Sequence, residues 1–159
     1  MKAPKIFWKA LSFGALAGSR SMAAPALLMY QLSRNPSKKL AATRLDFMQH
    51  PAPALAAQLF MAGEFAGDKL PAAPNRIAPK VLLGRALAGA LVGATIYARE
   101  EKDITKGALI GLGAAVASTY LTFFVRRSCA GESKLRDKVI GVAEDVLAFN
   151  AGRKLIETL

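Results

Sequence analysis

The sequence predicts an all-α protein that crosses a membrane as a bundle of helices. Three observations lead to this prediction. The 159-residue chain is 53% hydrophobic, which is above the apolar share of ordinary soluble domains. Its apolar residues form long runs, and its basic residues cluster between those runs, as in the loops of membrane proteins. Glycines four residues apart recur within the runs, a spacing that lets neighbouring helices approach closely.

Length and charge narrow the class of protein further. The chain fits a single membrane domain, residues 1–159, with the lipid bilayer as its main partner. A net charge of +11 would suit nucleic-acid binding, but basic and aromatic residues do not alternate, so no nucleic acid is expected. The lone Cys129 and the lone His50 lie far apart, so neither a metal nor a cofactor is expected.

The first apolar run, residues 11–32, is predicted to be a retained membrane segment. Its basic start and short apolar core also fit a cleaved signal peptide, which is the alternative. Arg20 interrupts that core, however, and the apolar character resumes beyond it. Pro25 predicts a kink or break in the helix.

The second and third apolar runs are residues 51–67 and 81–98. A basic loop precedes the second run and contains Arg34, Lys38, Lys39 and Arg44. The loop after the second run is rich in proline and cannot be helical throughout. Both runs are predicted to be membrane helices.

The fourth run, residues 107–125, is the clearest predicted span. Its 19 residues carry no charge and would reach about 28 Å as a helix, close to the thickness of the hydrocarbon core. Residues 103–105 offer helix caps before it, and a basic loop, residues 126–138, is predicted after it. The fifth run, residues 139–151, is short and acidic, so it suits either a span or a re-entrant or interfacial helix. Four or five membrane segments are therefore expected.

Pairs of glycines spaced as G-x-x-x-G occur in each of the first four segments. They are Gly14 and Gly18, Gly63 and Gly67, Gly89 and Gly93, and Gly107 and Gly111. Because this spacing places both glycines on one helix face, it favours close contact between helix backbones in lipid. The four pairs predict a compact bundle.

Two parts of the chain resemble each other. Residues 14–18 (Gly-Ala-Leu-Ala-Gly) match residues 107–111 (Gly-Ala-Leu-Ile-Gly), and residues 61–64 align with residues 141–144. The predicted repeats are residues 10–71 and 105–152, joined by a connector helix at residues 81–98. If each segment crosses once, the odd connector inverts the second repeat, as in many transporters. The alternative is a coincidence between two strings rich in alanine and glycine.

Seven ionisable residues lie in or near the apolar segments. They are Arg20, Glu64, Asp68, Lys69, Arg85, Glu144 and Asp145. Charge at membrane depth is costly and marks functional sites, so these residues predict a pathway for an ion or small solute. Glu64 and Glu144 would be its titratable pair, facing each other across the repeat, and the arginines would be anion contacts or counter-ions.

Two other functions remain open at this point. The same ionisable residues could form a buried ion-pair network that fixes helix register in a non-catalytic membrane scaffold. A Mg²⁺-dependent phospholipid-processing enzyme is the third hypothesis, because carboxylates such as Asp68 favour that ion. The sequence contains no histidine-based dyad, nucleophile elbow or P-loop, so an enzyme is not expected.

Three stretches give the chain a resemblance to a known family. They are residues 64–71 (Glu-Phe-Ala-Gly-Asp-Lys-Leu-Pro), Arg85 with residues 88–91 (Ala-Gly-Ala-Leu), and residues 143–148 (Ala-Glu-Asp-Val-Leu-Ala). With them the chain resembles the bacterial membrane proteins grouped as domain of unknown function 4126, over most of its length. The resemblance implies a small, multi-pass helical protein of the bacterial inner (plasma) membrane and implies no activity. A homodimer is expected if one bundle of this size is too small to enclose a pathway.

Overall fold

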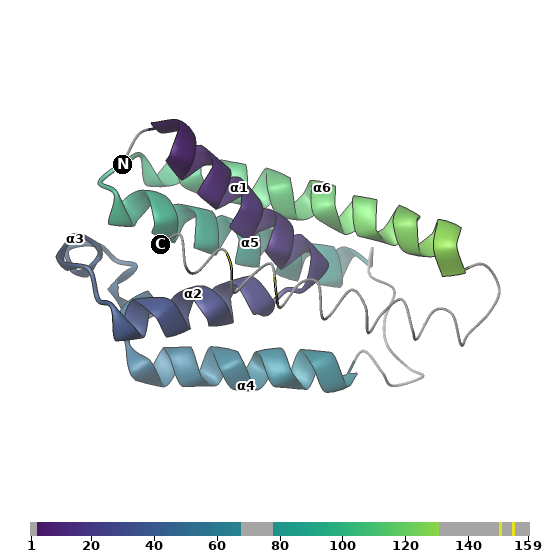
Figure 1. The fold of residues 1–159 in the computed structure, drawn as a ribbon, viewed down its shortest axis with the longest axis horizontal. Coiled ribbons are helices and arrows are strands. Elements are labelled where there is room, and N and C mark those ends of the chain that lie inside the picture. Colours follow the sequence, from purple (N-terminus) through teal and green to yellow (C-terminus); the bar gives the residue numbers. More distant parts are fainter. Residues whose placement is uncertain (1–2, 68–77, 131–149, 151–153, 155–159) are drawn as a thin grey trace.

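All the regular secondary structure in the residues that the structure describes is helical. The structure is a computed structural model that describes residues 3–67, 78–130, 150 and 154. Within them the chain forms helices and no strand (Figure 1). In chain order the elements are α1 (Ala3–Ser19), α2 (Ala23–Arg34), α3 (Lys38–Ala41), the 3₁₀ helix η1 (Asp46–Gln49), α4 (Pro51–Gly67), α5 (Pro79–Arg99) and α6 (Ile104–Ala130). The predicted all-α fold is confirmed for this part of the chain.

The first predicted membrane segment is two helices rather than one. α1 ends at Ser19 and α2 begins at Ala23, and the two run in opposite directions (Figure 1). Lys9 of α1 and Leu32 of α2 line the same hollow, so the start of α1 lies beside the end of α2. The single crossing predicted for residues 11–32 is therefore wrong.

The reversal between α1 and α2 follows from Pro25 and from the hydrogen bonds of the turn. Pro25 is the third residue of α2, where its missing N–H costs no bond within the helix. It could not continue α1, because it has no N–H to donate to the carbonyl four residues back. The N–H of Arg20 still donates to Leu16 (2.9 Å), whereas that of Ala23 donates only three residues back, to Arg20 (3.3 Å). The break predicted from Pro25 is confirmed, and it reverses the chain.

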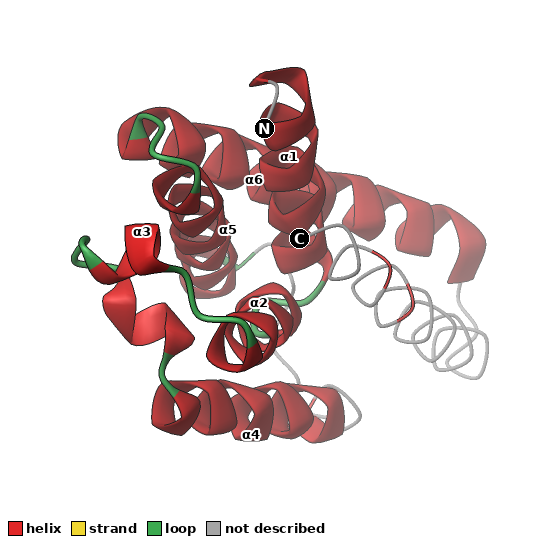
Figure 2. Cartoon of the chain, turned by 60° about the vertical axis from the view of Figure 1, so that its left-hand side comes forward, coloured by secondary structure: helices red, strands yellow, loops and turns green. Residues whose placement is uncertain are grey.

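The helices pack in two groups. α1, α5 and α6 contact one another, and α2 packs on α4 (Figure 2). The short elements α3 and η1 join the end of α2 to the start of α4. Leu40 of α3 and Met48 of η1 are both fully buried, so they hold this connection against the bundle. The simple basic loop predicted here is therefore wrong, although Lys38 and Lys39 do face solvent.

The remaining predicted segments agree with the helices apart from their ends. Residues 51–67 coincide with α4, and α5 extends the predicted 81–98 by a few residues. At the start of α6 the Oδ1 atom of Asp103 accepts the N–H of Thr105 (3.0 Å) and of Lys106 (3.4 Å), which confirms the predicted cap. α6 continues to Ala130, so residues 126–130 are helical and the prediction that a loop begins at residue 126 is wrong.

α5 and α6 pack antiparallel with their backbones in close contact. Gly93 of α5 faces Gly107 of α6, and Gly89 faces Gly111. A methyl group on Gly89 would lie 2.5 Å from the carbonyl oxygen of Gly111, closer than side-chain carbons approach in real structures. Only glycine therefore fits at these crossing points.

α1 and α6 pack parallel, with residues 14–18 of α1 against residues 111–118 of α6, so the matched stretch 107–111 takes part only through Gly111. Gly14 faces Gly111, and Gly18 faces Ala115 one turn later on both helices. The hydroxyl of Ser118 also donates to the carbonyl of Ala15 (2.8 Å). Matched segments of an inverted repeat would point in opposite directions, and these two point the same way.

The second half of the proposed repeat cannot be compared with the first. The aligned residues 141–144 lie outside the described residues. Gly63, in the first half, has open space where a methyl group would be, so it marks no contact with another helix among the described residues.

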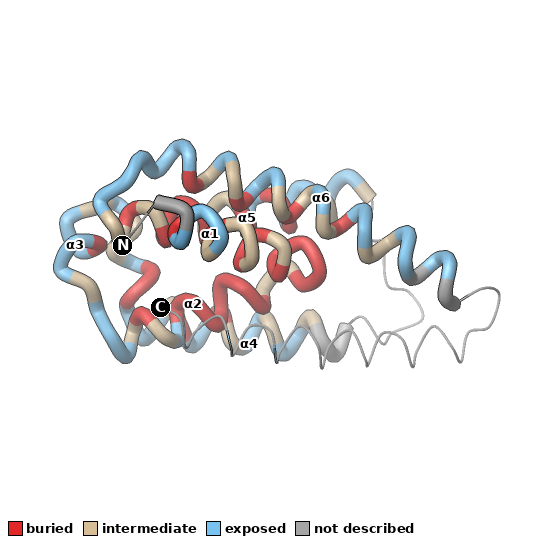
Figure 3. Tube along the Cα trace, turned by 45° about the horizontal axis from the view of Figure 1, so that its top comes forward, coloured by how far each residue is buried: buried red, intermediate tan, exposed pale blue. Residues whose placement is uncertain are grey.

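Two helices in the described part of the chain are long and apolar enough to cross a membrane. They are α5 and the stretch of α6 from Ile104 to Val125. Half of the apolar window of α5 is buried inside the protein, but only 17% of that of α6 is (Figure 3). Large apolar side chains on α6, such as Leu109 at 63% and Leu121 at 65%, are exposed instead. The other helices have fewer than 18 residues each.

Candidate functional site

The turn between α1 and α2 gathers three of the most buried polar side chains of the described bundle. Arg20 in the turn is 1% exposed and Arg85 of α5 is 2% exposed. Thr119 of α6 is fully buried, and Glu64 reaches the turn from the far end of α4. These residues from four parts of the chain form one group, here called the turn cluster: Arg20, Glu64, Arg85 and Thr119.

Glu64 binds the start of α2. Its Oε1 atom accepts the N–H of Ser21 (2.9 Å) and its Oε2 atom accepts the N–H of Met22 (2.9 Å). Met22 occupies the N-cap position of α2, and its own side chain makes no capping hydrogen bond. A carboxylate is well suited to this place, because the first N–H groups of a helix have no partner within it and carry partial positive charge.

Arg85 and Thr119 both bind the carbonyl oxygen of Gly18. The Nη1 atom of Arg85 donates to it at 3.0 Å, and Oγ1 of Thr119 lies 2.9 Å away. In a continuous helix this carbonyl would accept the N–H of Met22, four residues on. Since that N–H donates to Glu64 instead, the end of α1 is stabilised by side chains from α5 and α6.

Thr119 was not identified from the sequence. Its hydroxyl also lies 2.8 Å from the carbonyl of Ala115, so it can donate to its own helix or to α1. A threonine in an apolar run is common, and nothing local distinguishes this one. What distinguishes Thr119 is its position one turn beyond Ala115, at the contact between α1 and α6. This contact is known only from the fold.

Arg20 is the largest side chain that is almost fully buried in the described residues. A buried guanidinium is costly unless it is paired and hydrogen-bonded. With Arg85 it brings two positive charges to the turn cluster, against the single carboxylate of Glu64.

Three of the seven predicted site residues are brought together by the structure. They are Arg20, Glu64 and Arg85, at one end of the bundle. Asp68, Lys69, Glu144 and Asp145 lie outside the described residues, so the predicted pairing of Glu64 with Glu144 stays a prediction. Among the described residues, no group of three or more His, Cys, Asp or Glu side chains is placed to hold a metal ion.

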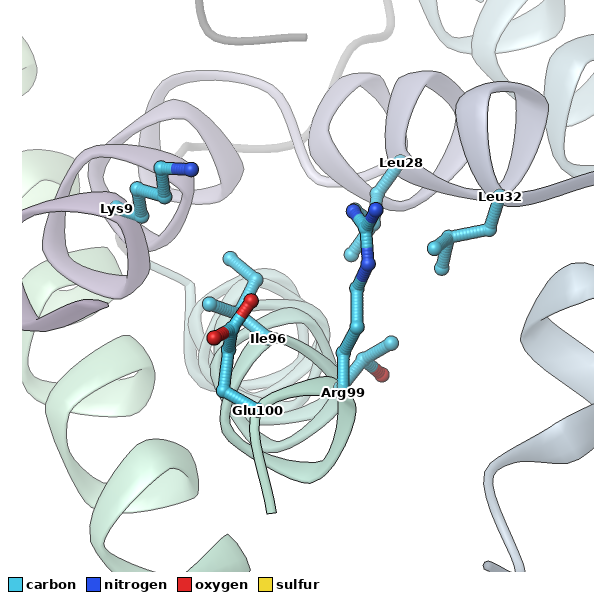
Figure 4. Close-up of a pocket in the computed structure, with 7 residues that line it drawn as sticks. Lys9, Leu28, Leu32, Ile96, Arg99 and Glu100 are labelled. Carbon is cyan, nitrogen blue, oxygen red and sulfur yellow. The ribbon is translucent and has the colours of Figure 1, made fainter. Parts of the chain in front are cut away.

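A separate hollow lies at the opposite end of the bundle, between α1, α2 and α5. Lys9, Arg99 and Glu100 line it, together with the apolar Leu28 and Leu32 (Figure 4). The sequence did not predict this hollow, because Lys9 comes from α1 whereas Arg99 and Glu100 come from the end of α5, far along the chain. It is narrow, and the turn cluster does not contribute to it.

The chain matches no protein-family model, no curated protein and no solved structure. The resemblance to domain of unknown function 4126 therefore stays a prediction from residues 64–71 and the two other stretches.

Proposed function

We propose that this chain is a small multi-pass protein of the bacterial inner membrane that passes a small ion or solute through its helix bundle. The observation that carries the proposal is the burial of Arg20 and Arg85, to 1% and 2%, within a bundle that has apolar outer faces. Ionisable groups inside a membrane are rare and costly, and they usually face a pathway for ions or solutes. The turn cluster is the proposed centre of that pathway.

The outer faces of three helices support a place in the bilayer. Large apolar side chains on them are more than half exposed: Leu55, Leu59 and Phe60 on α4, Leu83 and Leu87 on α5, and Leu109, Leu121, Phe124 and Val125 on α6. Contiguous apolar surface of this kind is unusual on a soluble monomer and is expected of helices that face lipid. The resemblance noted above supports the same location.

The broken helix gives the turn cluster a plausible way to bind a solute. Transporters often bind ions at the ends of interrupted helices, where backbone groups lack partners within the helix. Here the N–H groups of Ser21 and Met22 are held by Glu64. We infer that a small anion competes with the Glu64 carboxylate for these N–H groups and is attracted to them by the positive charges of Arg20 and Arg85.

A scaffold is the second candidate, and the contacts of Glu64, Arg85 and Thr119 favour it. Each of these side chains binds the backbone of the turn at Gly18, Ser21 or Met22. The turn cluster would then fix the reversal of the chain and move nothing. No observation favours the phospholipid-processing enzyme, and the homodimer stays a prediction.

Arg85 offers the sharpest test between transport and scaffold. The protein is reconstituted in vesicles, and the flux of chloride, protons and potassium is measured for the wild type, Arg85→Lys and Arg85→Met. The two variants have similar side-chain length, but only lysine keeps the charge. If an anion passes the turn cluster, Arg85→Met abolishes chloride flux and Arg85→Lys retains a measurable part of it.

Two controls separate a lost pathway from a lost fold. Gly93→Ala disturbs the contact between α5 and α6 outside the turn cluster and changes no charge, so it should lower stability and retain flux. Lys80→Gln removes an exposed charge near the start of α5 and should change neither. A folded wild type that gives no more flux than empty vesicles would refute transport and leave the scaffold.

A further inference from the structure

The turn between α5 and α6 and the short helix α3 form an open, basic hollow at one end of the bundle. Three lysines stand around it: Lys38 and Lys39 from α3, and Lys102 from the turn. Ile104, which is 40% exposed, and nearby alanines give it an apolar floor. Glu101 is its single acidic residue. We call this site the α3 hollow.

The backbone of the turn fixes the shape of the α3 hollow. Glu101 has a φ of 53°, in the left-handed region, and its N–H donates to the carbonyl of Ala98 (3.1 Å). The N–H of Lys102 donates to the carbonyl of Tyr97 (2.9 Å). Across the hollow, Nζ of Lys39 binds Oε2 of Glu101 at 2.7 Å. One lysine is thereby neutralised, and the other two keep the hollow positively charged.

The α3 hollow lies where a membrane surface would be. The turn that forms one side of it joins α5 to α6, the two helices that are long and apolar enough to cross a bilayer. The start of α1, the end of α2 and η1 lie at the same end and carry exposed aromatic side chains: Phe7 (38%), Trp8 (62%), Tyr30 (39%) and Phe47 (42%). Tryptophan and tyrosine are enriched at the level of lipid headgroups.

We propose that the α3 hollow binds the phosphate of an anionic phospholipid, so that this end of the bundle faces a negatively charged leaflet. Basic sites beside membrane helices recognise such headgroups by charge. The apolar floor and the exposed aromatic residues favour a lipid over a soluble anion, which would gain nothing from them. The inference rests on the membrane location proposed above and is independent of transport.

The test measures lipid binding by native mass spectrometry of the full chain in a neutral detergent. Phosphatidylglycerol and phosphatidylcholine with the same acyl chains are added separately to the wild type and to the double variant Lys38→Gln/Lys102→Gln. The wild type should prefer phosphatidylglycerol. Each lysine should contribute roughly fivefold to the affinity, so the double variant should bind phosphatidylglycerol about 25-fold more weakly.

A matched control removes two charges from the other end of the bundle. Lys80 and Arg127 are also exposed, and Lys80→Gln/Arg127→Gln should keep the wild-type preference. An equal loss in both double variants would overturn the site, because it would show attraction by overall charge. Equal binding of the two lipids by the wild type would overturn it too, as would displacement of phosphatidylglycerol by millimolar inorganic phosphate.

Trp8 reports on the membrane location separately, since it is the only tryptophan in the chain. In mixed vesicles, its fluorescence should be quenched more by brominated phosphatidylglycerol than by brominated phosphatidylcholine. Quenching by neither lipid would refute the membrane location and with it the α3 hollow. Selective quenching without any chloride flux would uphold the α3 hollow and refute only transport.

Discussion

The carboxylate of Glu64 takes the N–H of Met22 that the carbonyl of Gly18 would accept if α1 continued. This exchange joins the end of α4 to the start of α2 and lets the chain reverse. Glu64 was predicted to be one of two acids in a pathway. The structure gives it a backbone partner at each oxygen, with Ser21 as the second.

Replacing Glu64 should therefore lower stability whatever the function is. In Glu64→Ala two partly buried N–H groups lose their acceptor, which should cost about 1–3 kcal/mol of unfolding free energy. Glu64→Gln should lower the unfolding free energy by less, because the remaining side-chain oxygen still accepts one of the two N–H groups. The NH₂ group of the glutamine would face the other N–H and could not accept it. Denaturation in detergent measures both variants. An unchanged midpoint in Glu64→Ala would show that the cap contributes nothing.

Gly111 should not tolerate a larger side chain. A methyl group there would fall well within 3.0 Å of the α5 backbone, so Gly111→Ala should destabilise the protein by about 1–3 kcal/mol. Gly113, two residues on, has open space at the same point. Gly113→Ala should be neutral or stabilise by up to about 1 kcal/mol, through helix propensity. Equal thermal midpoints for the two variants would contradict the packing described here.

The contribution of Thr119 to the stability of the fold should depend on its hydroxyl group rather than on its shape. Thr119→Val keeps the volume and leaves the Gly18 carbonyl with one donor fewer, so it should cost about 1 kcal/mol. Thr119→Ser keeps the donor and loses a buried methyl group. A double-mutant cycle with Arg85→Met should show coupling, since both side chains bind the same carbonyl. Additive effects would mean that the two hydrogen bonds are independent.

Leu112 distinguishes a helix in lipid from one in water. It is 37% exposed near the middle of the apolar stretch of α6. In a bilayer, Leu112→Arg should cost about 2.5–3.5 kcal/mol of insertion and lower the amount of membrane-integrated protein. Ser128→Arg adds the same charge at an exposed position beyond that stretch and should have little effect. Equal integration of both variants would argue against a lipid-facing α6.

Asp46 should titrate at lower pH than an ordinary aspartate. Hydrogen bonds from Gln49 and then from His50 hold the pKa of Asp46 below its usual 3.8. A lowered pKa stabilises the fold above the unfolded value, and this contribution is lost as pH falls through the folded value. Gln49→Ala should raise the pKa of Asp46 toward 3.8, as measured by NMR titration. A smaller rise is expected in His50→Ala, and no rise in either would contradict the bonds described.

The turn cluster shows what local sequence can and cannot predict about a site. Arg20, Glu64 and Arg85 were identified because charge within apolar runs is costly wherever the chain goes. Their partners were not identified, because these are backbone groups exposed only by the break after Ser19. Thr119 was missed for the same reason, since its role depends on the contact between α1 and α6.

The sequence by itself determined most of the helical stretches of the described residues, and the burial of Arg20 and Arg85. α4 has its predicted bounds and α6 its predicted cap, because hydropathy, proline and capping act within a few residues. Pro25 predicted a kink or break within residues 11–32, but only the tertiary structure decided that the chain reverses there. A long apolar run is compatible with one helix or with two, and the outcome depends on whether distant groups can satisfy the backbone at the break. Glu64, Arg85 and Thr119 do so here, and they meet only when the bundle is packed.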